Sequence, residues 1–444
     1  MAGCDDLASL LRQELIQRAE EGCDVSGFQE AVAAAGTDAA RAALYDQLMA
    51  LPVRPDFPYI EPSELAEIRA ERPDGPRRLR ATLTDAKWQD RFRGAWLGRC
   101  AGCALGKPLE AWPFMSGAAG NPGWKNIQLW FAGADAWPIT GYTPGRSRAK
   151  ETLGIDLAPG CRESERENIR FMQTDDDLRY TVLGLLLLEQ KGRDFDSWDI
   201  GKHWHRWLTY SQVWTAETQA YLNFAQVTSH MKGGKPEDWQ IKKQWVRTHR
   251  NPYREWIGAQ IRADAWAYGA AGHPELAAEF AWRDASFSHV KNGIYGEMFM
   301  AAVIAAAFVE PDVEKIIEIG LSEIPRNCRL ARDIRKAVEI ARDATDQTQL
   351  VSRVWETFQH YHPVHTNNNA ALATAALVFA RDDYEKAITT AVLGGWDTDC
   401  NGATTGSIMG ARLGAAALPE KWTAPLNDTL YAEIPGFHPI AISE

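Results

Sequence analysis

The first fifty residues show a helical pattern of apolar positions. Leu7, Leu10, Leu11 and Leu15 recur at spacings of three and four, which predicts an amphipathic helix near the start of the chain. A second, alanine-rich amphipathic stretch runs over residues 32–51 and predicts further helix.

The following segment, 52–85, has a different character. It contains six prolines among many charged residues, which is typical of a linker or of an arm that lies along a protein surface. We therefore predict a boundary near residue 85, with an N-terminal helical extension and linker over 1–85 and a second domain over 86–444. The alternative, in which the early helices simply pack on the main body, stays open at this point.

From residue 86 onward the helical period dominates and alternating, strand-like segments are scarce, which predicts a compact, multi-helix, all-α domain. Residues 112–165 are rich in Gly, Pro and Trp and show little periodicity, so we expect long ordered loops or a lid there. The predicted helices span 178–190, 257–271, 274–286, 296–309, 331–344, 369–379, 384–393 and 401–416.

Two ladders of glycine stand out within the helical pattern. Glycine recurs at every fourth position from Gly94 to Gly106 and again from Gly402 to Gly414. Because a spacing of four places residues on one helical face, each ladder predicts a helix with a bare stripe. A glycine costs a helix about 1 kcal/mol relative to alanine, so the two ladders favour close packing of two central helices.

Composition and charge narrow the function classes. The chain has 48 basic and 59 acidic side chains, a net charge of −11, and no long basic run, which argues against nucleic-acid binding. The longest apolar run, 298–309, covers 12 residues, whereas a membrane span needs about 20. The chain begins with acidic residues where a secretory signal would be basic, and its seven cysteines are scattered. We therefore expect a cytoplasmic protein without membrane or nucleic-acid partners, and its oligomeric state stays open.

The first acidic cluster is the Asp-Asp-Asp sequence at 175–177, directly before an apolar helical run. Thr174 is placed to cap this helix, with Asp177 three residues on as in a capping box. Acidic residues in a first turn favour the helix dipole by about 0.3–1 kcal/mol each. Three consecutive carboxylates exceed what capping needs and repel one another, so a hard cation would resolve the repulsion.

A second acidic cluster stands at the start of another predicted helix, where Asp397 and Asp399 flank a threonine. Carboxylates two positions apart with an intervening hydroxyl supply oxygen ligands suited to Mg²⁺. One such cluster alone is more often surface capping. Two of them, each opening a helix and one leading into a glycine ladder, favour a metal site.

Three ordered motifs resemble the signatures of the ADP-ribosylglycohydrolase family, which contains dinitrogen reductase-activating glycohydrolase and the ADP-ribosyl-acceptor hydrolases. Residues 90–110 match Asp-Arg-(Ile/Phe)-x-Gly-x-x-x-Gly-x-x-x-Gly-Asp-Ala-Leu-Gly-x-Pro-x-Glu nearly throughout. Residues 174–176 match Thr-Asp-Asp ahead of an apolar helix, and residues 395–400 align with Gly-Gly-Asp-Thr-Asp-Thr. The resemblance covers about residues 88–422.

The resemblance implies an all-α fold that carries two Mg²⁺ ions in a cleft, and it implies which residues bind these ions. Thr174, Asp175 and Asp176 would hold one ion. Asp397 and Asp399 would complete the pair, with Asp399 as the bridging ligand. Two divalent ions in such a site can orient a ribose, lower the pKa of a water molecule and stabilise developing charge.

The resemblance also implies catalytic and substrate-binding residues. Glu110, which ends the first motif, and Asp399 are the candidate catalytic residues. Weaker similarities to the family occur at 258–262 and 284–289. The substrate contacts that we expect are His289, Asn292, Gly258 and Trp396.

Four positions depart from the family pattern. Cys103 stands in place of Asp, Asp177 in place of Thr, Trp396 in place of Gly, and Cys400 in place of a Thr that commonly ligates the second metal. A thiol is a poor ligand for Mg²⁺. Three alternatives therefore stay open for the second ion next to Asp177 and Cys400: weak binding, ligation by Asp177 or water, or a different metal.

Two other clusters carry weaker signals. Cys100 and Cys103 have the spacing of a redox or zinc motif, but no second pair accompanies them, and we interpret them as buried small residues. The histidines at 360, 362 and 365 could ligate a metal, but a proline interrupts them and no acidic partner adjoins. We interpret this segment as a loop.

These features favour a Mg²⁺-dependent hydrolase that cleaves an N- or O-glycosidic bond at the ribose C1 of small-molecule or protein-linked ADP-ribose conjugates. The alternatives are a metal-dependent N-glycosidase acting on a smaller nucleoside or specialised metabolite, and a non-catalytic binding protein that retains the fold. The distribution of tryptophan indicates where the substrate specificity of this chain differs from that of the family. None of the 18 tryptophans precedes Trp88, and eight lie within 198–266. There the usual substrate-loop sequence is least recognisable.

Overall fold

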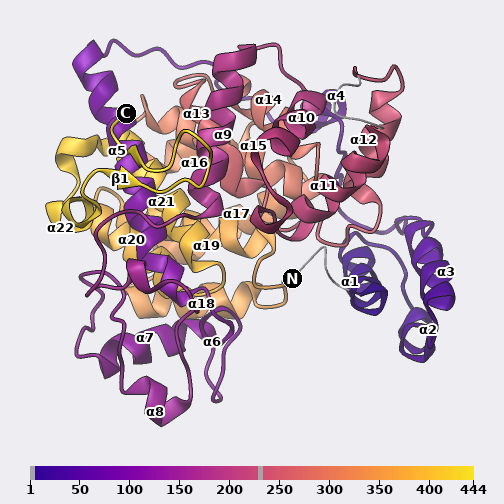
Figure 1. The fold of residues 1–444 in the computed structure, drawn as a ribbon, viewed down its shortest axis with the longest axis horizontal. Helices are drawn as coiled ribbons and strands as arrows, with labels where there is room; N and C mark the ends of the chain where they lie inside the picture. The colour runs from indigo at the N-terminus through magenta and orange to yellow at the C-terminus, as the bar shows by residue number, and fades with distance from the viewer. Residues whose placement is uncertain (1–5, 229–233) are drawn as a thin grey trace.

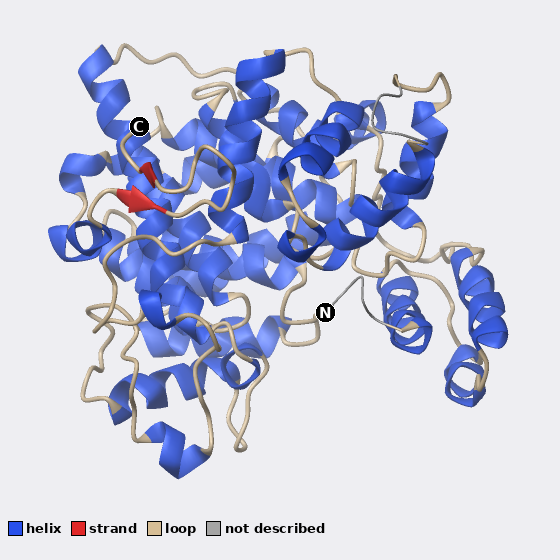
Figure 2. Ribbon diagram, viewed as in Figure 1, coloured by secondary structure: helices blue, strands red, loops and turns tan. Residues whose placement is uncertain are grey.

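The computed structural model describes residues 6–228 and 234–444 of the 444-residue chain. These residues form a helical molecule whose one sheet pairs two short antiparallel strands, β1 (Thr429–Leu430) and β2 (Ile440–Ala441) (Figure 2). The prediction of an all-α fold is confirmed. The acidic start of the chain lies largely outside the described residues.

The N-terminal extension forms short helices that contact the main body. They are α1 (Leu7–Glu20), α2 (Phe28–Ala34), α3 (Asp38–Met49) and α4 (Leu65–Glu71), and Figure 1 shows α1 to α3 together at one side of the molecule. The expected continuous stretch over 32–51 is wrong, because the chain leaves the helix at Gly36 and Thr37 caps α3 by accepting a hydrogen bond from the Ala40 amide at 3.3 Å. The boundary near residue 85 stays a prediction.

The segment after the first glycine ladder contains more helix than its composition suggested. The elements are α5 (Asp85–Gly106), a 3-10 turn η1 (Lys107–Leu109), α6 (Trp112–Met115), α7 (Gly123–Gly133), α8 (Ala149–Leu153) and η2 (Arg162–Ser164). Helix α7 buries Ile127, Trp130 and Phe131 at spacings of three and one, a single apolar stripe that the surrounding glycines and prolines obscured. The expectation of loops alone over 112–165 was therefore wrong.

The next third of the chain departs from the sequence prediction more often: three of its described helices, all within 197–248, lie where no helix was predicted, and one predicted helix begins late. Its elements are α9 (Asp176–Lys191), α10 (Ser197–Trp207), η3 (Tyr210–Gln212), α11 (Thr215–Val227), α12 (Trp239–Thr248), η4 (Gln260–Arg262) and α13 (Ala263–Tyr268). The helix expected over 257–271 begins only at Gln260, because the Ile257 amide instead donates to the Val364 carbonyl at 2.9 Å. Tertiary pairing here overrides the local pattern.

The last third follows the predicted helices closely. Its elements are α14 (Pro274–Ala285), α15 (Lys291–Ala307), α16 (Val313–Leu321), α17 (Arg329–Asp343), α18 (Gln347–Phe358), α19 (Thr366–Ala380), α20 (Tyr384–Leu393), α21 (Thr398–Leu413), η5 (Ala415–Ala417), α22 (Glu420–Thr423) and η6 (Ala424–Leu426). The prediction for α20 is confirmed residue for residue. Across the described ranges, no helix is long and apolar enough to cross a bilayer.

Helices α5 and α21 pack against each other through the two glycine ladders, in antiparallel register. A Cβ atom at Gly98 would lie 2.2 Å from the Gly406 carbonyl oxygen, and one at Gly102 would lie 1.9 Å from that of Gly402. No side chain fits in such a space, so the predicted close approach of two helices is confirmed. The register places the end of α5 beside the start of α21.

Candidate active site

One cavity collects most of the acidic residues that the motifs contain. It has a volume of about 520 Å³ and opens where the end of α5, the start of α9 and the turn before α21 meet. The predicted site residues that line it are Glu110, Thr174, Asp175, Asp176, Gly258, Asp397, Asp399 and Cys400. We call this cavity the acidic pocket.

The glycine ladders determine how two sides of the acidic pocket meet. At the last rung, the Thr398 hydroxyl donates a hydrogen bond to the Gly106 carbonyl at 2.9 Å, and a Cβ on Gly106 would lie 2.2 Å from the Thr398 carbonyl oxygen. This approach brings Glu110 to Asp397 and Asp399, whose carboxylate oxygens lie within 4.8 Å of one another.

The turn before α21 is fastened by an amide side chain from α19. The Asp397 amide donates to Asn369 Oδ1 at 3.2 Å, and Asn401 Nδ2 donates to the same oxygen at 2.8 Å. Trp396 within this turn has a φ of 59°, in the left-handed region, and a bulky residue there costs about 1–3 kcal/mol. The hydrogen bond from the next residue, Asp397, to Asn369 therefore helps to hold Trp396 in a backbone conformation that a bulky residue does not favour.

At the start of α9, Asp175 is the N-cap residue, and its Oδ1 accepts a hydrogen bond from the Asp177 amide at 3.0 Å. The prediction that Thr174 caps the helix is wrong, because Asp175 takes the capping position and Thr174, one residue before it, instead accepts from Arg179 at 2.9 Å. The second oxygen of Asp175 accepts from Lys107 Nζ at 2.5 Å. Both oxygens of this carboxylate are thus bound.

Asp177 lies behind the acidic pocket, in the core between α5 and α9. Its Oδ1 accepts a hydrogen bond from Arg99 at 3.1 Å, and Arg99 also forms an ion pair with Asp264 at 2.7 Å. Since Arg99 and Asp177 are fully buried, this pair joins the two helices from inside.

The pKa values show an excess of negative charge in the pocket. Burial, followed by the charge of Asp175, raises the pKa of Asp399 to about 7 and that of Asp176 to about 6. Glu110 is exposed as a residue, yet the protein around its carboxyl group, with Asp399 adding, raises its pKa well above 4.5. Burial alone would also raise the pKa of Asp175, but the Lys107 ammonium outweighs it and lowers that pKa. One lysine does not neutralise this cluster.

A comparison with protein families identifies the chain. The model of the ADP-ribosylglycohydrolases matches residues 84–439, which is most of the sequence. The chain belongs to the ADP-ribosylglycohydrolase family. It is also similar to a solved structure described as an ADP-ribosylglycohydrolase-related protein complex, at 21% identity and a TM-score of 0.46, over 77% of this chain and 93% of that one. A comparison with curated proteins finds no match.

The ADP-ribosylglycohydrolase family is metal-dependent, and the donor atoms of the acidic pocket fit a hard cation. Among the described residues, four overlapping groups of three side chains place possible ligand atoms within 4.8 Å of one another, and Asp399 belongs to three of these groups. Within the same described ranges, the buried atoms Asp397 Oδ1 and Asp399 Oδ1 have no hydrogen-bond partner. Unpaired carboxylate oxygens of this kind suit Mg²⁺ and similar ions.

Two sulfur atoms complete the surroundings of Asp399. Cys103 and Cys400, which replace oxygen-bearing residues of the family pattern, each belong to one of the groups that contain Asp399. Burial, followed by the charge of a neighbouring aspartate, raises the pKa of both thiols well above 9. They stay protonated at neutral pH and are poor ligands for a hard cation.

His289 and Asn292, two of the predicted substrate contacts, lie outside the described lining of the acidic pocket. His289 is buried, with Nδ1 2.8 Å from the Ser288 hydroxyl, and burial lowers its pKa well below 6.5. Asn292 Nδ2 donates to Glu255 at 2.7 Å. The structure therefore places both among buried polar contacts of the core.

The tryptophans divide between the pocket and the core. Trp214 and Trp256, from the tryptophan-rich stretch, line the acidic pocket, and Trp214 is 42% exposed. Trp396 lies outside that lining and stacks on Trp355, with ring centroids 5.2 Å apart. Its contacts fasten the turn that carries Asp397, whereas its predicted contact with substrate has no geometric support.

Four charged residues of the pocket lining were not recognised in the sequence: Lys107, Arg179, Glu217 and Glu433. Lys107 stands inside the first motif, three residues before Glu110, and Arg179 lies one helical turn after Asp175, so spacing alone could have indicated both. Glu217 has no such signal. Its carboxylate lies where a Cβ at Gly258 would be, at 2.2 Å, which explains the glycine at that position.

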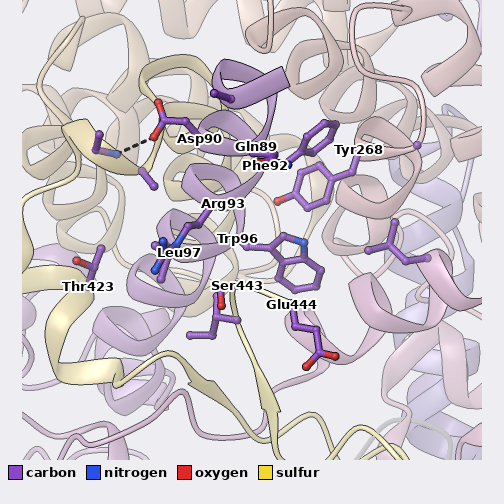
Figure 3. Close-up of a pocket in the computed structure, with 16 residues that line it drawn as sticks. Gln89, Asp90, Phe92, Arg93, Trp96, Leu97, Tyr268, Thr423, Ser443 and Glu444 are labelled. Atoms are coloured by element: carbon purple, nitrogen blue, oxygen red, sulfur yellow. Dashed lines mark hydrogen bonds between the residues drawn. The ribbon is translucent and has the colours of Figure 1, made fainter. Parts of the chain in front are cut away.

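A second cavity, of about 980 Å³, lies along the first half of α5 (Figure 3). Asp90, Arg93 and Trp96 line it from α5, with Tyr268 and Glu444 from other parts of the chain. The predicted site residues all lie outside its described lining. The acidic pocket is therefore the candidate active site.

Proposed function

We propose that this protein is a Mg²⁺-dependent glycohydrolase that cleaves the N- or O-glycosidic bond at the ribose C1 of an ADP-ribose conjugate. The observation that carries the proposal is the group of unpaired carboxylate oxygens at one end of a pocket whose lining also contains an arginine and tryptophans. Its family acts on ADP-ribosylated substrates, which supports the substrate class.

The oxygen donors for Mg²⁺ in this proposal are Thr174, Asp175, Asp176, Asp397 and Asp399, and all of them line the acidic pocket. A bound Mg²⁺ supplies orientation for ribose hydroxyls and for a water molecule, and it lowers the pKa of that water. The unpaired Oδ1 atoms of Asp397 and Asp399 support this assignment.

Glu110 and Asp399 take the proton-transfer roles. One of these carboxylates, in its ionised form, accepts a proton from the attacking water as the water oxygen bonds to C1. The bond from C1 to the leaving nitrogen or oxygen breaks while C1 has oxocarbenium character, and the leaving group takes the bonding electrons and a proton from the other carboxyl group, in its protonated form. Because Glu110 is exposed and Asp399 is 2% exposed, Glu110 is the group that exchanges its proton with solvent.

Other lining residues suit the rest of an ADP-ribose group. Arg179 binds Thr174 and Glu433, while its buried Nε has no hydrogen-bond partner within the described chain. A guanidinium group is a strong partner for a pyrophosphate. The exposed ring of Trp214 offers a surface on which a purine can stack.

The test is hydrolysis by the full chain of ADP-ribosyl-arginine, ADP-ribosyl-serine, O-acetyl-ADP-ribose and free nucleosides, with Mg²⁺ or with EDTA. We expect release of ADP-ribose from at least one conjugate only with Mg²⁺, and at least about 100-fold less with Asp399→Asn. The matched control is Asp135→Asn, at an exposed aspartate paired with Arg148, which should keep full activity. Cleavage of nucleosides alone would support the smaller-substrate alternative, and an undiminished rate in Asp399→Asn would overturn the proposal.

A further inference from the structure

Lys107 is a cation built into the acidic pocket. It is the first residue of η1, directly after α5, and its side chain is 13% exposed. Its Nζ donates to Asp175 Oδ2 at 2.5 Å. The ammonium group therefore lies where a divalent ion bound by Asp175 would have to lie.

The carboxylates on this side of the pocket are already engaged. Asp175, 3% exposed, uses Oδ2 for Lys107 and Oδ1 for the Asp177 amide at 3.0 Å. Asp177 itself is paired with Arg99 at 3.1 Å. Of the three aspartates that open α9, Asp176 is the one whose carboxylate has no such partner among the described contacts.

On the opposite side of the pocket, the carboxylates have no lysine partner among the described contacts, and some of their oxygens accept no hydrogen bond. Glu110, Asp397 and Asp399 form an all-oxygen group within 4.8 Å, and Asp397 Oδ1 and Asp399 Oδ1 lack partners throughout the described residues. No lysine or arginine forms a described ion pair with any of these three carboxylates. The two remaining groups that contain Asp399 each include a cysteine, Cys103 or Cys400, whose thiol is a poor ligand for a hard cation.

We propose that Lys107 serves as the fixed cation of the α9 side, so that the pocket binds one divalent ion, through Glu110, Asp397 and Asp399, instead of two. This inference rests on the proposed metal-dependent function and changes the donor set given there: Glu110 joins Asp397 and Asp399 as a ligand, and Thr174, Asp175 and Asp176 no longer bind an ion. It also revises the two-ion expectation taken from the family resemblance. Lys107 is then a positioning residue: its charge holds Asp175 in place and partly offsets the repulsion among the carboxylates.

The test counts ions in the full chain, with Mn²⁺ as the probe. Titration calorimetry gives the stoichiometry, and electron paramagnetic resonance distinguishes a single Mn²⁺ from a spin-coupled pair. We expect one uncoupled ion in the wild type and in Lys107→Arg. We expect two coupled ions in Lys107→Met, because the substitution frees Asp175 Oδ2 beside Asp176.

The matched control is Lys150→Met, which removes an exposed lysine paired with Asp156 and should leave the count at one. Two coupled ions in the wild type, or a single ion in a folded Lys107→Met variant, would overturn the inference. The wild-type count decides the question even when Lys107→Met does not fold.

The same experiment separates this inference from the proposed function. A wild-type chain that binds two ions and hydrolyses ADP-ribose conjugates overturns the role of Lys107 alone. One bound ion without hydrolysis of any substrate in the panel overturns the proposed function alone. A chain that binds no Mn²⁺ overturns both.

Discussion

The contact between α1 and the main body, and the acidic pocket, both bury several carboxylates. In the α1 contact, Arg254 donates hydrogen bonds to Glu14 at 2.8 Å and to Glu21 at 3.1 Å. Beside them, Arg329 donates hydrogen bonds to Glu255 at 2.8 Å. These carboxylates and arginines are almost completely buried. We call them the paired cluster.

The acidic pocket holds more carboxylates but pairs only one of its lining aspartates with a lysine. Asp397 and Asp399 keep unpaired oxygens within the described structure. Burial raises both of their pKa values, with the charge of Asp399 adding to the shift of Asp397 and the charge of Asp175 adding to that of Asp399. A buried ion pair contributes little net stability but is costly to break. From this difference we infer that a buried carboxylate indicates a binding site only where the protein provides no counter-charge for it.

The largest expected effect comes from breaking the paired cluster. Arg254→Met leaves Glu14 and Glu21 buried without their cation, so the free energy of unfolding should fall by about 3–5 kcal/mol. We also propose that residues 1–85 unfold together with 86–444, because α1 supplies both partners of Arg254. Urea unfolding followed by circular dichroism and by tryptophan fluorescence tests both points, since no tryptophan precedes Trp88.

The two probes should give one coincident transition in the wild type. The control, Arg148→Met, removes an exposed pair with Asp135 and should change the unfolding free energy by less than about 1 kcal/mol. A separate early transition seen by circular dichroism alone would show that the extension folds independently.

Removing a charge from the acidic pocket should not destabilise the protein, in contrast to removing one from the paired cluster. Asp399→Asn removes a charge that Lys107 balances only in part, so the metal-free protein should be at least as stable as the wild type. Mg²⁺ at about 100 times its Kd should stabilise the wild type by about 2.7 kcal/mol and this variant much less. Thermal melts in EDTA and in Mg²⁺ measure both, and a metal-free variant less stable by several kcal/mol would contradict the comparison.

The effect that is smallest per pH unit concerns Glu20, which lies beside the paired cluster without a described ion pair to an arginine or lysine. Burial raises its pKa to about 8 although Arg329 opposes the shift, and its neighbour His365, 3.6 Å away, is neutral because burial lowers the pKa of the imidazole to about 3. A folded-state pKa above the unfolded value of 4.5 gives stability that is complete below pH 4.5 and lost as the pH rises through about 8.

One such group changes the unfolding free energy by at most about 1.4 kcal/mol per pH unit. Denaturation midpoints measured between pH 5 and 8 should therefore decline more steeply in the wild type than in Glu20→Gln, which cannot ionise. Equal slopes would contradict the assignment to Glu20.

Much of the site was predictable because its residues lie in contiguous motifs. The ladders of Gly94–Gly106 and Gly402–Gly414 predicted the α5–α21 contact, and that contact carries Glu110 to Asp399. The acidic clusters were recognisable because three adjacent carboxylates need an explanation beyond capping. The glycine ladders and the acidic clusters each consist of residues close together in the chain, so they can be recognised in a single sequence.

The remaining features depend on contacts between distant segments. Glu217 enters the pocket from α11, a helix without a motif, and the buried chain at 257–259 forms a turn, with the Ile257 amide bonded to the Val364 carbonyl. The arginine that neutralises Glu14 is 240 positions away in the sequence. Periodicity cannot indicate such a partner, so it could not distinguish the paired cluster from the acidic pocket.

The pairing of α5 with α21 also has a consequence for synthesis. Gly106 and Thr398, which meet at the pocket, are 292 positions apart in the sequence. At about 5–20 residues per second, a ribosome needs about 15–60 s to add the second helix after the first has emerged. During that time the glycine stripe of α5 has no helix to pack against and Glu110 lies apart from Asp399, so a nascent chain completes the acidic pocket only when translation is nearly finished.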